Sequence, residues 1–410
     1  MNFDDNPEEV KFRAEARAWL DANVPEEVLP YLNGTATNRE GFDLFAESKK
    51  WRKKKYDAGW SCLRWPKELG CRDLAPNLHV VWGQEEGVYK ALDGPFGIGE
   101  GMCGPTMMAY ATEEQKLRYL PKLASGEEIW CQMFSEPAGG SDVAGLRTRS
   151  VRDGDDWVIN GQKIWTSGAH YCDWGLLITR SDPDVPKHKG LTMFFLDMKS
   201  PGIEIRPIKQ VNGDSNFNEV YFTDVRVPDA QRLGEPGEGW RVAITTLMNE
   251  RMSIGGSFGT GFSDVLALVK SATVNGHPAA EDQAIREKVA EWHCRDNGLK
   301  YTTARLLSTV SMGGTPGPEG SIGKLVGASL QQELAMAAVQ LQGMAGLRHD
   351  SEFSEAAGRF QGMLLRSPAT RIEGGSDEIL RNIIAERVLG LPPDIRVDKN
   401  VPFKDIPSGV

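Results

Sequence analysis

The chain has 410 residues, of which 40% are hydrophobic and 25% are charged, and its formal net charge is −10. This length exceeds the size of one ordinary core and predicts two or three packed subdomains. The negative charge disfavours a surface that follows nucleic-acid phosphates, and no apolar run approaches the roughly 18 residues that a membrane-spanning helix needs. We therefore expect a globular protein that binds no nucleic acid and does not insert into a membrane.

The cysteines and the N-terminal residues bear on the compartment. Six cysteines are scattered without C-x-x-C spacing: Cys62, Cys71, Cys103, Cys131, Cys172 and Cys294. This spacing favours reduced thiols over disulfides or a zinc site, so we expect no bound metal. Residues 1–25 are acidic from the start and lack the basic and then apolar order of a secretion signal. Together these features predict a cytoplasmic protein.

Residues 1–126 show the spacing of helices. Asn6 stands directly before Pro7, which predicts a capped helix with proline in its first turn. The basic stretch 49–55 is typical of the solvated face of a helix. Small and apolar residues fill 91–106 and predict a loop between helices that either leaves room for a ligand or lets the helices pack closely. The sequence therefore predicts an N-terminal domain made only of helices.

Residues 127–233 change to a period of two, the spacing of strands. Asn160-Gly161 lies between two alternating runs and predicts a two-residue hairpin turn. Four further runs, bounded by Gly, Pro and Asp, are predicted to be strands: 174–180, 191–198, 202–208 and 218–228. This pattern predicts a middle domain built from an antiparallel, barrel-like sheet.

The helical period returns in residues 234–390, with a long predicted helix within 321–343. Residues 391–410 are rich in proline and predict an extended tail. The order of helices, then strands, then helices predicts an α+β multidomain fold with domain boundaries near residues 126, 233 and 390.

Two stretches of the β region carry residues suited to ligand binding. "FSEPAGGSD", residues 134–142, combines glycines with hydroxyls and lets the backbone approach a planar polar ligand, or forms an ordinary tight turn. "KIWTSGA", residues 163–169, places Trp165 where it packs in the core or covers the face of an aromatic cofactor. No G-x-G-x-x-G follows a predicted strand and no G-x-x-x-x-G-K-[ST] is present, so the common nucleotide loops do not explain the protein.

Three motifs in order, "SEPAGGSDVAGLRT", "VINGQKIWTSG" and "RIEGGSDEILRNIIAERVLG", resemble the acyl-CoA dehydrogenase family of flavoproteins over about residues 5–390. The resemblance implies an N-terminal helical domain, a middle β domain and a C-terminal four-helix domain, with FAD between the last two and across a subunit interface. It also implies a set of FAD contacts: Gln132, Phe134, Ser135, Ser141, Trp165, Ser167, Gln340, Gly343, Gly375 and Asp377.

Glu373 matches the catalytic base of the family. Desaturation of an acyl thioester removes a weakly acidic α-proton while hydride leaves the β-carbon, so it needs a carboxylate whose pKa is raised by desolvation. Gly374 and Gly375 let the chain pass close to substrate and flavin, and the Glu373 N–H helps to polarise the thioester carbonyl. The resemblance also places Ser141 and Gly374 beside the substrate.

Two features depart from the commonest family pattern. Glu250 stands directly before Arg251, at a position from which some members supply the base; we predict Glu373 as the base, with Glu250 as the alternative. Arg251 resembles the family arginine near the substrate thioester. Many relatives carry an arginine that reaches the FAD phosphate where this chain has Ala272, so another cation is expected to neutralise the pyrophosphate.

The resemblance implies a specific reaction. We predict an FAD-dependent dehydrogenase that makes a trans-2-enoyl-CoA and passes electrons to an electron-transferring flavoprotein, as a homotetramer or homodimer. One alternative keeps the fold and flavin but is an oxygen-using oxidase or a specialised dehydrogenase of aryl, dicarboxyl or steroid side-chain CoA thioesters. The other alternative is a catalytically silent binding or partner subunit.

Overall fold

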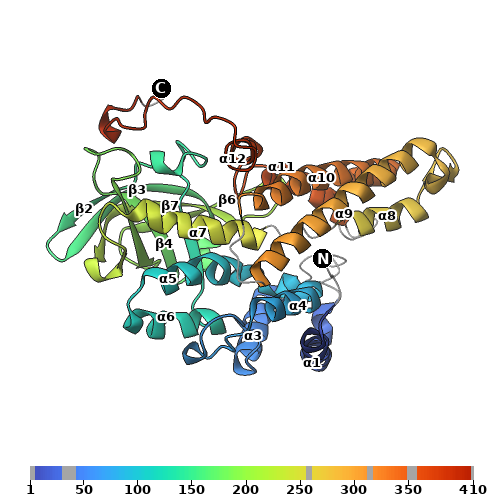
Figure 1. Cartoon of the computed structure of the whole chain (residues 1–410), viewed down its shortest axis with the longest axis horizontal. Coiled ribbons are helices and arrows are strands. Elements are labelled where there is room, and N and C mark those ends of the chain that lie inside the picture. The colour runs from blue at the N-terminus through green and yellow to red at the C-terminus, as the bar shows by residue number, and fades with distance from the viewer. Residues whose placement is uncertain (1–4, 30–42, 255–260, 312–316, 349–357, 408–410) are drawn as a thin grey trace. The chain divides into compact units, whose positions relative to one another are not determined.

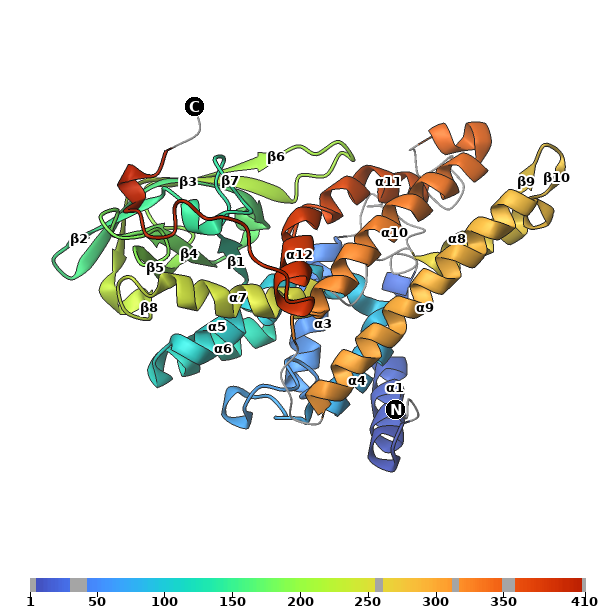
Figure 2. The same cartoon turned by 45° about the horizontal axis from the view of Figure 1, so that its top comes forward.

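The computed structural model describes residues 5–29, 43–254, 261–311, 317–348 and 358–407. The chain divides into two units (Figures 1 and 2). The helical unit comprises residues 1–47, 74–92 and 254–392; the sheet unit comprises residues 48–73, 93–253 and 393–410. Within the described ranges, no helix combines the length and apolar character needed to cross a membrane.

Two helices pair near the N-terminus of the helical unit, α1 (Pro7–Asn23) and α4 (Pro76–Glu86). Asn6 caps α1, because its side-chain oxygen accepts hydrogen bonds from backbone N–H groups of the first turn. The Glu9 carboxylate in turn accepts a hydrogen bond from the Asn6 N–H at 2.8 Å. This reciprocal pair confirms the predicted cap, which satisfies N–H groups that a helix start leaves unpaired.

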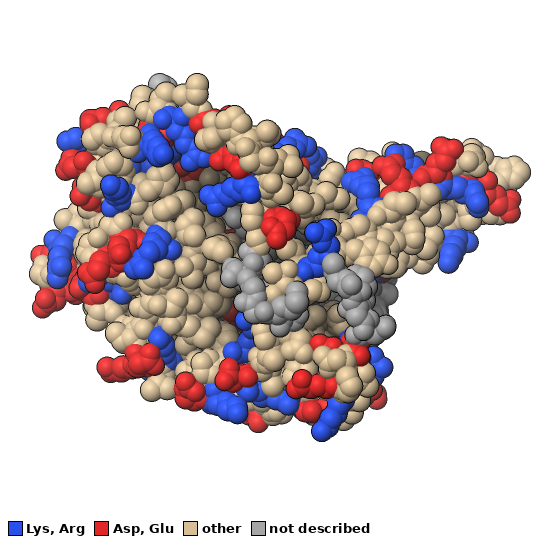
Figure 3. Space-filling view, in the orientation of Figure 1, with Lys and Arg blue, Asp and Glu red and all other residues tan. Residues whose placement is uncertain are grey.

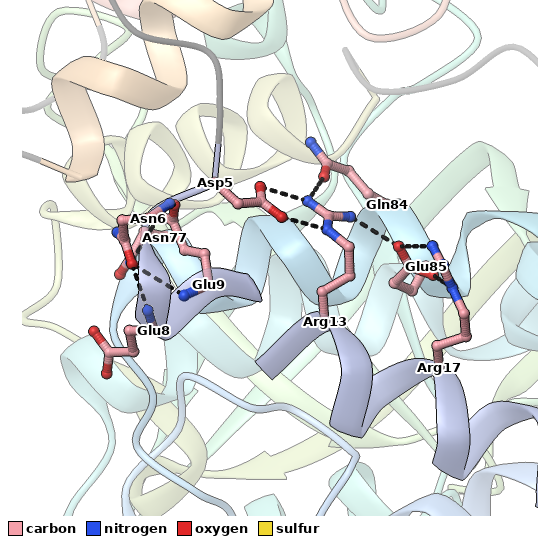
Figure 4. A network of polar contacts seen from close by, with 9 residues as sticks. All are labelled: Asp5, Asn6, Glu8, Glu9, Arg13, Arg17, Asn77, Gln84 and Glu85. Atoms are coloured by element: carbon pink, nitrogen blue, oxygen red, sulfur yellow. Dashed lines mark hydrogen bonds and ion pairs between the residues drawn. The ribbon is translucent and has the colours of Figure 1, made fainter. Parts of the chain in front are cut away.

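Polar side chains join α1 to α4 (Figure 4). Arg13 donates from Nη1 to Glu85 Oε1 at 2.8 Å and from Nη2 to Gln84 Oε1 at 2.7 Å. Arg17, one turn further along α1, donates from Nε to the other oxygen of Glu85 at 2.9 Å. One carboxylate of α4 therefore holds two guanidinium groups of α1, which fixes the register of the two helices.

The remaining helices of the helical unit pack around α10 (Gly320–Leu341), which confirms the long helix predicted in this region. They are α8 (Phe262–Ser271), α9 (Gln283–Ser311), α11 (Arg359–Thr370) and α12 (Asp377–Ile383). Apolar side chains from α8 to α11 form one core: Val265, Trp292, Leu330, Leu334, Ala335, Ala338, Phe360 and Met363. Burial of this shared core stabilises helices whose individual propensity would not suffice.

The sheet unit is built on eight strands in the order β6-β7-β3-β2-β4-β5-β8, with β1 paired to β4. The strands are β1 (Trp130–Met133), β2 (Arg149–Asp153), β3 (Asp156–Ser167), β4 (Trp174–Arg180), β5 (Leu191–Asp197), β6 (Ile203–Ile208), β7 (Phe217–Pro228) and β8 (Arg232–Leu233). The four predicted runs are confirmed as β4 to β7. Strand β4 runs parallel to β1 and β2, which the sequence pattern does not reveal because side chains alternate in both kinds of pairing.

Three helices pack on this sheet within the sheet unit: α5 (Gly104–Tyr110), α6 (Glu113–Ser125) and α7 (Gly239–Ile254). The unit also holds most of α3 (Leu44–Asp57). An aromatic cluster joins α6 to the strands. The ring of Tyr119 lies 4.8 Å from that of Trp174, and Trp174 stacks 5.9 Å from Trp130. These packed rings anchor β4 and also β1, from which the loop described below departs. The predicted α+β fold is confirmed.

The predicted hairpin turn at Asn160-Gly161 is wrong. Both residues lie inside β3, and the β2–β3 turn falls earlier, where Asp153 pairs with Asp156. A Cβ on Gly161 would lie 2.7 Å from the Thr148 Cα, so this glycine serves close backbone approach across a register shift in the sheet. Gly161 is therefore explained by the lack of space for a side chain next to Thr148, and not by a turn.

A second Asn-Gly pair does form a turn. Asn275 and Gly276 join β9 (Thr273–Val274) to β10 (His277–Pro278) with φ values of 53° and 83°. Two consecutive positive φ values are the signature of the I′ turn that suits hairpins. The same dipeptide thus has different roles, according to whether the flanking chain can fold back on itself.

The basic stretch 49–55 is not simply a solvated helix face. Arg52 and Lys55 of α3 are buried, and each pairs with acids: Arg52 Nη1 lies 2.6 Å from Glu100 Oε2, and Lys55 Nζ lies 2.6 Å from Asp93 Oδ1. Elsewhere on the face that Figure 3 shows, positive and negative side chains of the described residues are interspersed. The stretch was predicted to be a solvated face, but two of its cations are buried beside acids. The spacing of residues along a helix does not by itself tell which cations face inward.

The predicted loop at 91–106 is helical. It contains a 3₁₀ helix (Gly87–Phe96), a π-helix (Gly99–Cys103) and the start of α5. A Cβ on Gly104 would lie 2.3 Å from the Trp65 ring, so the small residues here allow tight helix packing and do not mark irregular chain.

Candidate active site

The first ligand-binding motif forms a loop, Phe134–Thr148, that leaves β1 in the sheet unit; it is called the 134–148 loop below. Its first turn is closed by two backbone hydrogen bonds, from the Glu136 N–H to the Gly139 carbonyl at 3.1 Å and from the Gly139 N–H to the Glu136 carbonyl at 3.0 Å. Ser135 and Ser141 flank this turn. The motif is therefore a tight turn, and this is compatible with ligand binding because the turn has a serine hydroxyl on each side.

The two sequence motifs meet in space. The Ile164 N–H of β3 donates to the Ser135 carbonyl at 2.9 Å, and the Lys163 ammonium donates to the Phe134 carbonyl at 3.1 Å. Three predicted FAD contacts at the end of β1 and the start of the loop, Gln132, Phe134 and Ser135, are thereby held beside the strand that carries Trp165 and Ser167.

A buried ion pair fixes this junction. Lys163 Nζ lies 2.8 Å from Glu136 Oε1, and both side chains are almost completely buried. Glu136 also accepts hydrogen bonds from the backbone N–H groups of Arg147 and Thr148. Burial lowers the pKa of Lys163 to about 8 although Glu136 opposes the shift, whereas the pKa of Glu136 is lowered because Lys163 and these donors outweigh its burial. Both ends of the loop are therefore tied to one carboxylate.

Trp165 has an unusual backbone and an unusual exposure. Its φ is 60°, in the left-handed region that side chains other than glycine rarely adopt, and 55% of the residue is exposed. Among the described residues, its ring meets the edge of Phe217, with the two ring centroids 6.0 Å apart. A backbone held in the left-handed region costs about 1–3 kcal/mol, and residues strained in this way cluster at binding sites.

Buried polar atoms beside Trp165 fit a bound cofactor. Gln132 Oε1 and Thr166 Oγ1 are buried and accept no hydrogen bond from the described residues. Unpaired buried polar atoms cost free energy and are normally satisfied, so these two call for an external partner. A flat heterocycle with polar edges, such as the flavin that the sequence predicts, meets that need.

Helix α7 brings an acid to the same place. Ala243 and Thr246 belong to its buried face, and Glu250 continues that face because it lies one further turn along the helix. Thr246 is fixed by a buried hydrogen bond to Thr106 at 2.9 Å. The Glu250 carboxylate then accepts a hydrogen bond from the Gln132 side-chain amide at 3.2 Å. Glu250 therefore faces the predicted flavin contacts and is not a residue of the outer helix surface.

Arg251 follows on α7, but its side chain is outside the described residues. Its predicted place beside the substrate thioester therefore stays a prediction.

The helical unit holds the other predicted site residues. Glu373 lies in the turn between α11 and α12, where Gly374 and Gly375 have φ values of 63° and 99°. Such φ values suit glycine. The Lys324 ammonium holds this turn by donating to the Gly375 carbonyl at 2.6 Å. The two glycines therefore form a turn with left-handed backbone, and their place beside substrate and flavin stays a prediction.

The Glu373 carboxylate has a cationic partner. Arg366 of α11 donates from Nη2 to Glu373 Oε2 at 2.5 Å, and about a third of each side chain is exposed. One oxygen of Glu373 is therefore engaged by a guanidinium, and a role as base requires that contact to open.

The predicted adenine-side contacts are also in the helical unit. Gln340 is an exposed residue in the last turn of α10, and Gly343 begins the following 3₁₀ turn with a φ of 56°. Asp377 is buried at the start of α12 and accepts from Arg371 Nε at 2.7 Å, so its carboxylate serves a structural pair. Ala272 ends α8 directly before the β9–β10 hairpin.

Two residues of the site escaped the sequence analysis. Glu136 and Lys163 stand inside the quoted motifs, yet their pairing joins segments 27 residues apart. A signal was present, because a lysine within an alternating strand is expected to face water, and its position on the buried face of β3 predicts an acidic partner. Which acid that is depends on the fold.

Comparison with known proteins places the whole chain in one family. The N-terminal, middle and C-terminal domain models of acyl-CoA dehydrogenases match residues 6–127, 131–225 and 237–389. The acyl-CoA dehydrogenase IpdE1 of Mycolicibacterium smegmatis is 40% identical over 401 residues, which cover 94% of this chain and 98% of the relative.

Solved structures agree. The Tcur3481-Tcur3483 steroid ACAD superimposes with a TM-score of 0.81 at 29% identity, covering 96% of this chain and 100% of that one. The ChsE4-ChsE5 complex of Mycobacterium tuberculosis gives a TM-score of 0.78 at 28% identity, with the same coverage. The chain therefore belongs to the acyl-CoA dehydrogenase family of flavoproteins.

Proposed function

We propose that this acyl-CoA dehydrogenase binds FAD and desaturates an acyl-CoA thioester between Cα and Cβ to the trans-2-enoyl-CoA. Members of the family depend on FAD. One observation carries the proposal: the 134–148 loop and the end of β3 are bonded together, and Glu250 reaches Gln132 at that junction. The proposed flavin contacts and a carboxylate thus lie within one compact unit.

The residues of the chain act by binding and orienting. When bound, FAD supplies the acceptor for the hydride that leaves Cβ. Trp165 offers an exposed ring for the flavin face, and Gln132 and Thr166 offer buried polar atoms for its edge. Ser135, Ser141 and Ser167 are proposed to bind the flavin with their hydroxyls. The backbone strain at Trp165 is consistent with a geometry set for the ligand.

The base is proposed from the same geometry. A carboxylate must take the α-proton while hydride leaves Cβ, and it must lie beside both substrate and flavin. Glu250 is bonded to a proposed flavin contact, whereas Glu373 is engaged by Arg366. This difference favours Glu250 over Glu373, and Glu373 remains the second candidate. Gly374 and Arg251 are proposed to stand near the thioester.

The substrate is proposed to carry a bulky ring system on its acyl group. The Tcur3481-Tcur3483 relative is a steroid ACAD, and a further relative that is 27% identical is a cyclohexane-1-carbonyl-CoA dehydrogenase. These resemblances support the steroid or cyclic members of the class over straight-chain enzymes. A linear acyl-CoA is the second candidate.

Electron acceptor and assembly complete the proposal. Electrons are proposed to leave the flavin for an electron-transferring flavoprotein. The enzyme is proposed to act as a homotetramer, a homodimer or a complex with a second family member.

The free cysteines support a reducing, cytoplasmic compartment: Cys62, Cys71, Cys103, Cys131, Cys172 and Cys294. Residues 1–126, 127–233 and 234–390 are proposed as the three domains, followed by the tail.

Anaerobic spectroscopy tests the proposal. The purified protein is titrated with a panel of linear, aryl, dicarboxyl and steroid side-chain CoA thioesters while the visible spectrum is recorded. We expect an oxidised flavin that is bleached by ring-bearing thioesters. A colourless protein that cannot be reconstituted with FAD contradicts cofactor binding, and a yellow protein that no thioester bleaches contradicts the reaction.

A second assay separates dehydrogenase from oxidase. Reduced enzyme is mixed with air-saturated buffer or with an artificial dye, and hydrogen peroxide and dye reduction are compared. Dye reduction with little peroxide supports the dehydrogenase, whereas stoichiometric peroxide supports the oxidase.

A further inference from the structure

The C-terminal tail docks on the sheet unit through one short segment. Residues 398–406, called the C-terminal strap below, lie against residues 181–190, the connection between β4 and β5. The Phe403 N–H donates to the Val185 carbonyl at 2.9 Å, and the Lys404 N–H donates to the Pro183 carbonyl at 3.0 Å. Figure 2 shows this part of the chain running beside the strands.

The aromatic ring of the strap covers a buried cation. The Arg180 guanidinium lies over the Phe403 ring at 3.7 Å from its centroid, and only 4% of Arg180 is exposed. The same guanidinium donates from Nη2 to the Ala144 carbonyl at 2.5 Å and from Nη1 to the Lys187 carbonyl at 2.7 Å. Arg180 thus joins the strap, the β4–β5 connection and the 134–148 loop.

A second cation repeats the link. Lys187 Nζ lies 2.7 Å from Asp398 Oδ2 of the strap and 2.8 Å from Asp142 Oδ2 of the 134–148 loop. Asp142 directly follows Ser141. Each end of the strap therefore reaches the loop through one cation, and neither link involves a residue of the proposed flavin set.

We propose that Phe403 and Asp398 are positioning residues: through Arg180 and Lys187 they hold residues 142–146 in place, so that the C-terminal strap completes the site for FAD and acyl-CoA. A cation–π contact with a desolvated guanidinium is strong, and a lysine shared by two carboxylates restrains both. Without the strap, Arg180 and Lys187 would still contact residues 142–146, but Arg180 would lose the ring that covers it and Lys187 would lose its second carboxylate. The proposal rests on the proposed function for its ligand and on the contacts of Arg180 and Lys187 for its geometry.

The test uses full-length Phe403→Ala and Asp398→Asn variants, with Phe403→Tyr as the conservative variant. Amide hydrogen exchange of residues 142–148 and the FAD dissociation constant are measured, followed by KM and kcat for the best thioester. Lys399→Ala, an exposed change next to Asp398, is the matched control. We expect faster exchange, and an FAD dissociation constant raised about three- to tenfold, the range for one lost cation–π contact.

The kinetic readout separates positioning from a general loss of stability. A purely structural role lowers Tm but leaves KM and FAD affinity of the folded enzyme unchanged, and that result overturns the proposal. A rise in KM with kcat nearly constant in Phe403→Ala, reversed in Phe403→Tyr and absent in Lys399→Ala, supports it. If wild-type protein binds no FAD, the proposed function fails, and hydrogen exchange at 142–148 still decides whether the strap orders the loop.

Discussion

The Gln132 side-chain amide donates a hydrogen bond to the Glu250 carboxylate at 3.2 Å, which joins β1 to α7 inside the sheet unit. Glu373, the acid that the sequence favours as base, is bonded to Arg366 in the helical unit. Glu250 and Glu373 are thus the two candidates for the base that removes the α-proton. Because their surroundings differ, their glutamine variants are expected to behave differently.

Glu250→Gln is expected to reduce the rate of flavin bleaching by about 100- to 10,000-fold, the range for loss of a general base. Glutamine keeps the shape and can still accept from Gln132, so FAD binding is expected to persist. Glu373→Gln is expected to change the rate less than Glu250→Gln, because its carboxylate is already engaged by Arg366. Stopped-flow spectroscopy under anaerobic conditions compares the two variants at saturating thioester. If Glu373→Gln alone abolishes bleaching, Glu373 is the base and the geometric argument for Glu250 is wrong.

Lys163 and Glu136 are expected to depend on each other: removing one partner should destabilise the fold strongly, because the other is left buried without its counter-charge. Lys163→Met leaves a buried carboxylate without its cation, which costs about 3–5 kcal/mol of unfolding free energy. The double variant Lys163→Met with Glu136→Gln is expected to lose less than the sum of the single variants, by about 1 kcal/mol or more. Urea unfolding of the four proteins measures this coupling energy.

An exposed pair in the same sheet provides the control. Arg226 lies 2.9 Å from Asp153 with more than half of each side chain exposed, so Arg226→Met is expected to cost no more than about 1 kcal/mol. If Arg226→Met and Lys163→Met lower the unfolding free energy equally, then burial of the Lys163–Glu136 pair makes no difference to stability.

Alkaline pH provides an independent measure of the Lys163 environment. Burial lowers the pKa of Lys163 to about 8 in the folded chain, while an unfolded lysine titrates near about 10.4. Between these values the unfolded chain holds a proton that the folded chain has released, so raising the pH there makes the contribution of Lys163 to stability more favourable. Below pH 8 both states are protonated and the contribution is constant.

The expected observation is a difference between two proteins. The unfolding free energy of wild type minus that of Lys163→Met should be flat from pH 6 to about 7.5 and should rise between about 8 and 10.4. Urea titrations at half-unit pH intervals give this difference and cancel the other titrating groups. A difference that stays flat across this interval and falls only above about pH 10.4 would mean that Lys163 is protonated more readily in the fold than in the unfolded chain.

How far the sequence predicted the fold depends on the range of the signals. The helix cap at Asn6 was readable because its partners lie within three residues, and so was the period of β4 to β7. Arg52 and Lys55 were not, since the acids that bury them, Glu100 and Asp93, lie 48 and 38 residues further along the chain. Long-range pairing of charges has no periodic signature.

The site shows the same division. The motifs around Ser135 and Trp165 were found by their residue types, and the structure brings them together through the Ile164 N–H. The inward face of Glu250 was readable in principle from its spacing to Thr246. What the sequence could not supply is the partner of each acid, because Gln132 and Arg366 become neighbours only through packing.

The two Asn-Gly pairs separate two uses of glycine in one experiment. Gly161→Ala places a Cβ 2.7 Å from the Thr148 Cα and 2.6 Å from its Oγ1, so backbone in the sheet must shift. Gly276→Ala meets no atom within 4 Å and suffers only from its φ of 83°. We expect Gly276→Ala to cost about 1–2 kcal/mol, the penalty of the left-handed conformation. We expect Gly161→Ala to cost about 1–3 kcal/mol more, the range for overpacking.

The two variants should also differ in cofactor binding. Thr148 ends the 134–148 loop and donates its N–H to Glu136, so displacement of Thr148 is expected to weaken FAD binding in Gly161→Ala. Gly276 lies in the β9–β10 hairpin, where an added Cβ meets no atom of the described residues within 4 Å, so Gly276→Ala should bind FAD like wild type. Flavin fluorescence titration measures both. Equal FAD affinity in Gly161→Ala and wild type would show that the loop tolerates movement at Thr148, and that its anchoring at Glu136 alone sets the site.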